Sequence, residues 1–125
     1  MPKGKTKAER RRMLMQYRDL IEGKKFNPEA SENTVSNTRL YMLLSQVDCL
    51  DYDYADHIRD GKPGSIRARD MFDDVIDDIG TFTFRECCAY LTLIVRADRL
   101  EGGWFEKYLN NGSIYKLVNR LIEVM

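Results

Sequence analysis

The segment from Cys87 to Val95 is apolar on nearly every side of a helix, and a helix start stands directly before it. Thr83 and Glu86 have the T-x-x-E spacing of a capping box, in which each side chain bonds the other residue's backbone amide. We therefore predict a helix over about residues 84–97. A helix that is apolar all round has to be covered on all sides, which places it at the centre of a helical bundle.

Two further segments have the one-sided apolar pattern of helices that pack against such a centre. Near the N-terminus, Thr6 and Glu9 form another capping box, and Gly23 is a suitable stop. In the C-terminal segment Ser113 is the expected cap. The apolar positions recur at helical spacing: Met13, Leu14, Tyr17, Leu20 and Ile21 in the first segment, and Ile114, Leu117, Val118, Leu121, Ile122 and Met125 in the last.

A helix is also expected around the apolar positions Leu40 to Leu50, with Ser31 or Asn33 as its cap. Beyond it the pattern weakens, and Tyr52, Tyr54 and Ile58 either extend this helix or pack a loop. Gly61, Pro63 and Gly64 end the segment in both cases.

Two more helices complete the pattern. One is predicted over about residues 65–79, capped by Ser65 and ended by Gly80, with a connector carrying buried aromatic residues over 81–84. The other is a short helix over Trp104–Asn110, which the Asn111-Gly112 pair ends.

A chain of 125 residues with 43% hydrophobic and 32% charged residues is typical of one folded domain. We predict a flexible basic tail over residues 1–5 and a single all-α domain over 6–125, a compact bundle of five or six helices. No apolar run reaches the roughly 18–20 residues that span a bilayer, and no signal core follows the basic N-terminus. Three cysteines, Cys49, Cys87 and Cys88, are interpreted as reduced thiols of a cytoplasmic protein.

The net charge of zero conceals a segregation of charge along the chain. Residues 1–25 carry nine basic and three acidic side chains, whereas residues 48–86 carry eleven acidic and five basic ones. The two regions either pair with each other or meet different partners. The candidate nucleic-acid arm consists of Lys3, Lys5, Lys7, Arg10, Arg11 and Arg12. The candidate acidic partner-binding face consists of Asp70, Asp73, Asp74, Asp77 and Asp78.

Three motifs suggest chemistry, and each also has a structural interpretation. The D-D-x-x-D spacing at Asp73–Asp77 resembles a magnesium–diphosphate motif, but a second acidic helix is missing, which favours a solvated face. On a helix His57 would share a face with Asp53, although a surface histidine in an acidic loop is favoured. Cys87-Cys88 is either reactive or, as the following apolar run favours, buried. The sequence therefore predicts no catalytic residue, metal or cofactor.

Arg96, Asp98 and Arg99 form the most suggestive polar group in the chain, since the apolar pattern does not require them. Arg96 and Arg99 share a helix face at i, i+3, and two guanidinium groups can hold a phosphate or carboxylate. Trp104 is close enough in sequence to line such a site. The alternative is a structural network between these residues and a nearby carboxylate such as Glu101 or Glu106, and this interpretation is favoured.

The same stretch resembles a family of short bacterial and mobile-element proteins of unknown function. The resemblance is carried by an E-C-x-x-Y-L-T helix, an I-V-R-x-D-R segment, a glycine turn and an N-G pair. In this chain those are Glu86, Cys87, Tyr90, Leu91 and Thr92, then Ile94, Val95, Arg96, Asp98 and Arg99, then Gly103, Asn111 and Gly112. The resemblance implies a helical fold and the cytoplasm of a bacterial cell or a phage-infected host; it implies no activity.

Three functions follow as hypotheses. The favoured one is a non-enzymatic protein that binds and regulates or inhibits a partner protein, of which an anti-CRISPR-like inhibitor of host defence is one version. The second is a nucleic-acid-associated module that uses the basic arm. The third is a small-anion protein or enzyme that uses the cluster of Arg96, Asp98 and Arg99. A helix that is apolar all round also allows a homodimer.

Overall fold

The structure is a computed structural model that describes residues 5–22, 36–58 and 76–125. Over these ranges it consists of helices and contains no strand, which confirms the all-α class. The helices are α1 (Lys7–Ile21), α2 (Asn37–Gln46), α3 (Tyr54–His57), the 3-10 helix η1 (Ile76–Thr81), α5 (Phe84–Leu100), α6 (Trp104–Asn110) and α7 (Ser113–Val124). Within the described ranges, every helix is too short or too polar to span a bilayer.

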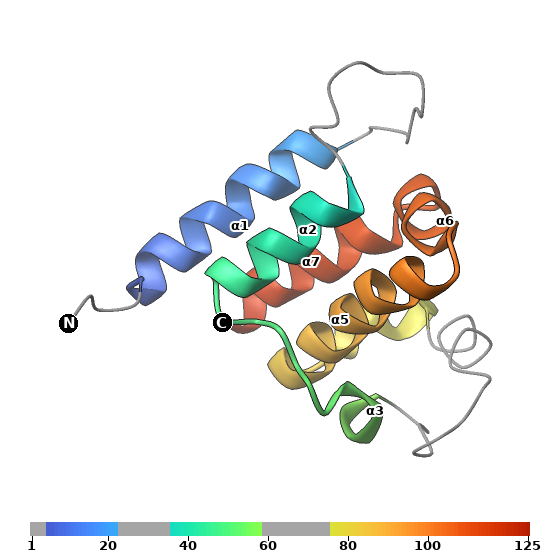
Figure 1. Cartoon of the computed structure of the whole chain (residues 1–125). Coiled ribbons are helices and arrows are strands. Elements are labelled where there is room, and N and C mark those ends of the chain that lie inside the picture. The colour runs from blue at the N-terminus through green and yellow to red at the C-terminus, as the bar shows by residue number, and fades with distance from the viewer. Residues whose placement is uncertain (1–4, 23–35, 59–75) are drawn as a thin grey trace.

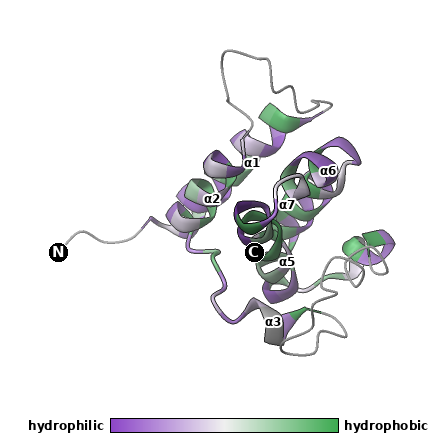
Figure 2. Ribbon diagram, turned by 45° about the vertical axis from the view of Figure 1, so that its right-hand side comes forward, coloured by the Kyte–Doolittle hydropathy of each residue, from purple (hydrophilic) through white to green (hydrophobic). Residues whose placement is uncertain are grey.

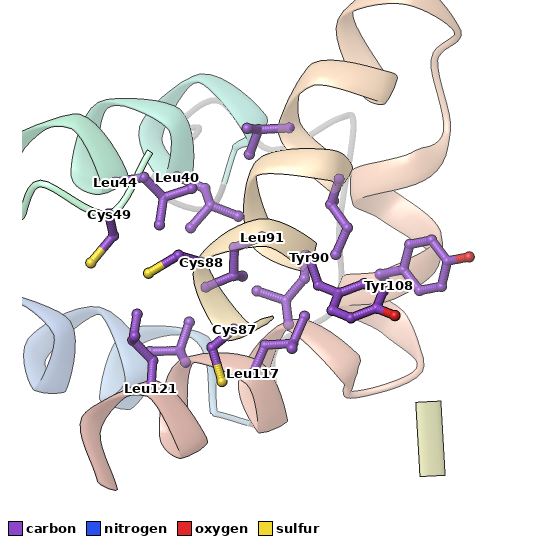
Figure 3. Packing of buried hydrophobic residues seen from close by; sticks show 14 of the residues in the cluster. Leu40, Leu44, Cys49, Cys87, Cys88, Tyr90, Leu91, Tyr108, Leu117 and Leu121 are labelled. Carbon is purple, nitrogen blue, oxygen red and sulfur yellow. The ribbon is translucent and has the colours of Figure 1, made fainter. Parts of the chain in front are cut away.

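The α5 helix lies at the centre of the bundle, where α2, α3, α6 and α7 all contact it (Figure 1). Its nine residues from Cys87 to Val95 are all buried, as the apolar pattern predicted. Hydrophobic residues gather where α5 and α7 face each other (Figure 2). The rings of Phe82 and Tyr90 stack with their centroids 4.9 Å apart. Figure 3 shows Leu91 of α5 and Leu117 of α7 among the packed side chains of the core.

The α1 and α2 helices form an outer layer over this centre (Figure 1). The α1 helix packs mainly on α7, and α2 packs mainly on α5. A side-chain hydrogen bond accompanies each pairing: Arg18 Nη1 donates to Asn119 Oδ1 at 3.1 Å, and Asn37 Nδ2 donates to the Val95 carbonyl at 3.1 Å. The buried faces of the two helices consist of Leu14, Tyr17 and Ile21 on α1 and Leu40, Leu43 and Leu44 on α2.

Both predicted capping boxes are confirmed. At the start of α1 the Glu9 amide donates to Thr6 Oγ1 at 3.1 Å and the Thr6 amide donates to Glu9 Oε1 at 3.3 Å. The bond from the Thr6 backbone also holds the pKa of Glu9 below its usual value. At the start of α5 the corresponding distances between Thr83 and Glu86 are 3.1 and 2.9 Å. Each box satisfies amides that the first helical turn leaves without a partner.

The predicted ends of α2 and α5 are wrong. Ser36, rather than Ser31 or Asn33, caps α2 by accepting a bond from the Arg39 amide at 3.1 Å. The helix stops at Gln46 instead of continuing to Leu50, because Asp48 has a φ of 60° that no α-helix contains. By contrast, α5 continues to Leu100, three residues beyond the predicted end.

The start of α7 also differs from the prediction. Ser113 is the first helical residue and is buried, and Gly112 occupies the cap position with a φ of 85°. Asn111 supplies the acceptor: its Oδ1 receives the Ser113 amide at 3.0 Å and the Ser113 hydroxyl at 2.6 Å. Ser113 thus acts as a donor to the turn, whereas a cap residue would accept.

The region before α5 is only partly described. Of the helix expected over 65–79, residues 65–75 lie outside the described residues, as do Gly23 and the 61–64 turn. Gly80 does not end a helix; it lies inside η1. In the expected aromatic connector Phe82 is fully buried, but Phe84 begins α5 and is exposed, since it points away from the core.

Candidate functional site

Asp98 holds the turn that joins α5 to α6. Its Oδ1 accepts the backbone amides of Gly103 at 3.2 Å and Phe105 at 3.0 Å. Gly103 has a φ of 106° and offers no side-chain cap to α6, so the carboxylate of Asp98 takes that role from the preceding helix. Trp104 is buried in the same turn. The carboxylate is therefore engaged in the architecture of the bundle.

The two arginines of this cluster extend outward. Arg96 and Arg99 are both exposed, and the Arg99 guanidinium lies over the ring of Tyr41 at 5.5 Å from its centroid. This contact is a cation–π interaction between α5 and α2. Neither arginine lines the two hollows described below. Asp98 thus links α5 to the start of α6, Arg99 links α5 to α2, and Arg96 remains on the surface.

The predicted charged surfaces are described in part. Lys5, Lys7, Arg11 and Arg12 are exposed on α1 and the residues before it, and Arg10 is half-buried. Asp77 and Asp78 are exposed on η1. Lys3 of the basic arm, and Asp70, Asp73 and Asp74 of the acidic face, lie outside the described residues.

A groove of about 540 Å³ runs between α1 and α2. Met13, Gln16, Tyr17 and Leu20 of α1 form one wall, at the i, i+3, i+4 and i+7 positions of a single helix face. The opposite wall and one end consist of Ser36, Thr38, Arg39, Met42, Leu43 and Gln46. The side chain of Met42 remains 53% exposed. The groove lies between α1 and α2 because α1 packs mainly on α7 and α2 mainly on α5, so the two outer helices contact each other only slightly.

Three polar atoms of α1 and α2 are buried without a hydrogen-bond partner among the described residues. They are Nε of Arg10, the hydroxyl oxygen of Tyr17, a residue of the groove wall, and Oδ1 of Asn37 at the start of α2. Burial raises the pKa of Tyr17 above its usual value, against the lowering effect of the Arg39 charge. A buried hydroxyl without a hydrogen-bond partner costs about 1–3 kcal/mol of stability.

A second hollow of about 390 Å³ contains the only histidine. His57 Nδ1 lies 2.6 Å from Asp51 Oδ2, and Asp51 Oδ1 accepts the Asp53 amide at 3.0 Å. The backbone of Asp51 is fixed in turn by a bond from its amide to Thr92 Oγ1 at 3.0 Å. The alternative in which His57 shares a helix face with Asp53 required a helix through both residues, whereas α3 begins only at Tyr54.

The remaining walls of this second hollow are Asp48, Cys49, Leu50, Phe84, Arg85 and Cys88. A carboxylate bonded to one imidazole nitrogen orients the ring, an arrangement that general bases also use. Among the described residues no group of three side chains is placed to hold a metal ion. Cys87 and Cys88 are buried, as the apolar run indicated.

Sequence reasoning missed the groove, although part of the signal was present. The apolar stripe of α1 was assigned to the core as one unit, yet Met13 and Leu20 at its edge are only partly buried. The five apolar positions of α1 make a face wider than α7 alone covers. The side chains at the edge of this face line the groove. On α2, Met42 lies off the buried face that Leu40 and Leu44 form, so the pattern indicated its exposure but not that it would face α1 across a groove.

The model of a family of unknown function, DUF6508, matches residues 49–125. The match includes α5, α6 and α7, the His57–Asp51 pair and every wall of the second hollow except Asp48. It leaves the α1–α2 groove outside. No curated protein and no solved structure matches the chain. Since the matched segment is more than half of the sequence, the chain belongs to the DUF6508 family.

Proposed function

We propose that this protein binds an acidic amphipathic helix of a partner protein in the α1–α2 groove and regulates the partner by that contact. The observation that carries the proposal is a groove of about 540 Å³ that has apolar side chains on both walls, Met13 and Leu20 on one and Met42 and Leu43 on the other. The proposal keeps the class of function that the sequence favours, a binding protein, and assigns it to a surface. It requires no catalytic step.

The shape and chemistry of the groove suit a helix. Two nearly parallel helical walls form a trough into which a third helix places apolar side chains at i, i+3, i+4 and i+7. Met13 and Met42 stand on opposite walls. Methionine is unbranched and polarizable, so such a surface adapts to the side chains of its occupant. Leu20 and Leu43 supply further apolar area.

The charge of the two walls favours an acidic occupant. Residues 5–22 and 36–46 together carry seven basic and three acidic side chains. Arg39 lines the groove itself, and the exposed Arg12 lies one turn before Gln16 on α1. Complementary charge speeds encounter and disfavours basic competitors.

The test compares matched glutamate substitutions inside and outside the groove. The partner is captured from a bacterial lysate with the wild-type chain, and its Kd is then measured with each variant. Met42→Glu removes apolar area and places a negative charge against an acidic occupant, and we expect it to weaken binding at least about tenfold. Tyr52→Glu changes a residue that is 73% exposed and lies outside the groove, and we expect no more than about a twofold effect. Equal affinity of both variants would refute the groove as the binding surface.

A nucleic-acid function is the second candidate, because Lys5, Lys7, Arg11 and Arg12 are all exposed. Such a cluster binds phosphates without reading base sequence. If this function holds, duplex DNA binding should weaken steeply as salt increases, and removal of residues 1–12 should abolish it. Binding that persists in the truncated chain would exclude these residues as the contact.

A further inference from the structure

Two thiols that are distant in sequence meet in the second hollow. Cys49 follows the end of α2, and Cys88 lies in the first turns of α5. Both line the same hollow of about 390 Å³, although only 2% and 5% of their surfaces are exposed. Figure 3 shows the Cys88 side chain extending from α5 toward Cys49. The hollow gives a small molecule a route to a pair that is otherwise enclosed.

The two thiols lie close enough to shift each other's ionisation, and they do so in opposite directions. The Cys49 thiol donates to the Val47 carbonyl at 3.5 Å. The neighbouring Cys88 thiol lowers the pKa of Cys49, although burial opposes this effect. The interaction with Cys49, followed by burial, raises the pKa of Cys88. Cys49 is therefore the thiol that reacts first, since the thiolate is the reactive form.

We propose that Cys49 and Cys88 are a peroxide-sensitive pair, in which Cys49 is oxidised first and Cys88 resolves it to a disulfide. The Cys49 thiolate attacks one oxygen of hydrogen peroxide; an S–O bond forms, the O–O bond breaks, and the departing hydroxide takes a proton to become water. The Cys88 sulfur then attacks Cys49; the S–S bond forms, the S–O bond breaks, and the proton of Cys88 leaves with the second hydroxide as water. The two thiols lose two electrons and the peroxide gains them.

Cys87 is not part of this pair. It is fully buried, and Figure 3 shows its side chain extending toward Leu117 and Leu121 of α7, away from Cys49. It therefore provides a matched control one residue from Cys88. Disulfide formation would join the segment carrying Asp51 and His57 covalently to α5. The expected consequence is a more rigid wall around the histidine.

The experiment exposes the reduced, folded full-length chain to hydrogen peroxide and follows its intact mass and its non-reduced peptide map. We expect a loss of about 2 Da and a peptide that joins Cys49 to Cys88. Cys87→Ser should behave in the same way. Cys88→Ser should stop at the sulfenic acid, about 16 Da heavier, which dimedone traps. The oxidised wild type should also unfold at a temperature about 5–15 °C higher than the reduced one.

Three results would overturn the proposal. One is a disulfide that includes Cys87. Another is oxidation of the folded chain without any cross-link. The third is a folded chain that peroxide leaves unchanged while the same chain in guanidinium is oxidised, since that would mean the hollow gives no access. The peptide map of the wild type decides among these outcomes even if Cys88→Ser fails to fold.

Discussion

Replacement of Asp98 by alanine tests whether the arginine–aspartate cluster is architectural. The substitution removes the acceptor of two amides, Gly103 at 3.2 Å and Phe105 at 3.0 Å, and the second of these belongs to a buried residue. A hydrogen bond to a charged group contributes about 1.5–3 kcal/mol, and the more exposed of the two contributes less. Loss of a helix cap alone costs about 1 kcal/mol. We expect Asp98→Ala to reduce the free energy of unfolding by about 2–3 kcal/mol.

In a chain of this length, that loss corresponds to a Tm about 10 °C lower. Urea denaturation followed by circular dichroism measures the free energy, and calorimetry measures Tm. Asp98→Asn keeps one oxygen acceptor and should lose about half as much. Arg96→Ala removes an exposed side chain and should stay within about 0.5 kcal/mol of the wild type. If Asp98→Ala is as stable as Arg96→Ala, the two bonds do not hold the turn and the architectural interpretation fails.

Three further substitutions test the scaffold by urea denaturation. Thr83→Ala removes one half of the α5 capping box and should cost about 1 kcal/mol; an unchanged midpoint would contradict the role of the box. Leu117→Ala empties a fully buried position opposite α5 and should cost about 2–5 kcal/mol, whereas a loss below about 1 kcal/mol would mean that this layer is loosely packed. Gly112→Ala strains a backbone with a φ of 85° and should cost about 1–2 kcal/mol. Gly80→Ala, whose surroundings are open, should cost less, and equal losses would refute the argument from φ.

The capping boxes and the buried run of α5 were predictable from sequence because each depends on residues close together in the chain. The box at Thr83 and Glu86 depends on residues three apart, and the burial of Cys87 to Val95 depends on the absence of any polar side in that run. The cap at Asn111 was missed although it is equally local. Asn and Ser compete for such positions, and only the φ of Gly112 decides which residue is the acceptor.

The candidate sites were harder to predict because they depend on tertiary distances. Asp98 could be singled out as unusual, but its bonds cross a turn whose geometry Gly103 sets. Helical spacing offered Asp53 as a partner of His57 only if that stretch was helical, and the chain instead turns so that Asp51 reaches the ring. No sequence pattern predicted that Cys49 and Cys88 lie close together, since the packing of separate segments brings them to the same hollow.

The most direct test of the proposed function places a photoreactive amino acid at position 42, in the groove, and in a second variant at position 52, outside it. The chain is irradiated with its partner, and mass spectrometry identifies the cross-linked peptide. The proposal predicts that position 42 links to a partner segment with net negative charge and apolar residues at helical spacing, and that position 52 links to none. Equal cross-linking at both positions, a basic partner segment at position 42, or a link to a second copy of this chain would contradict it.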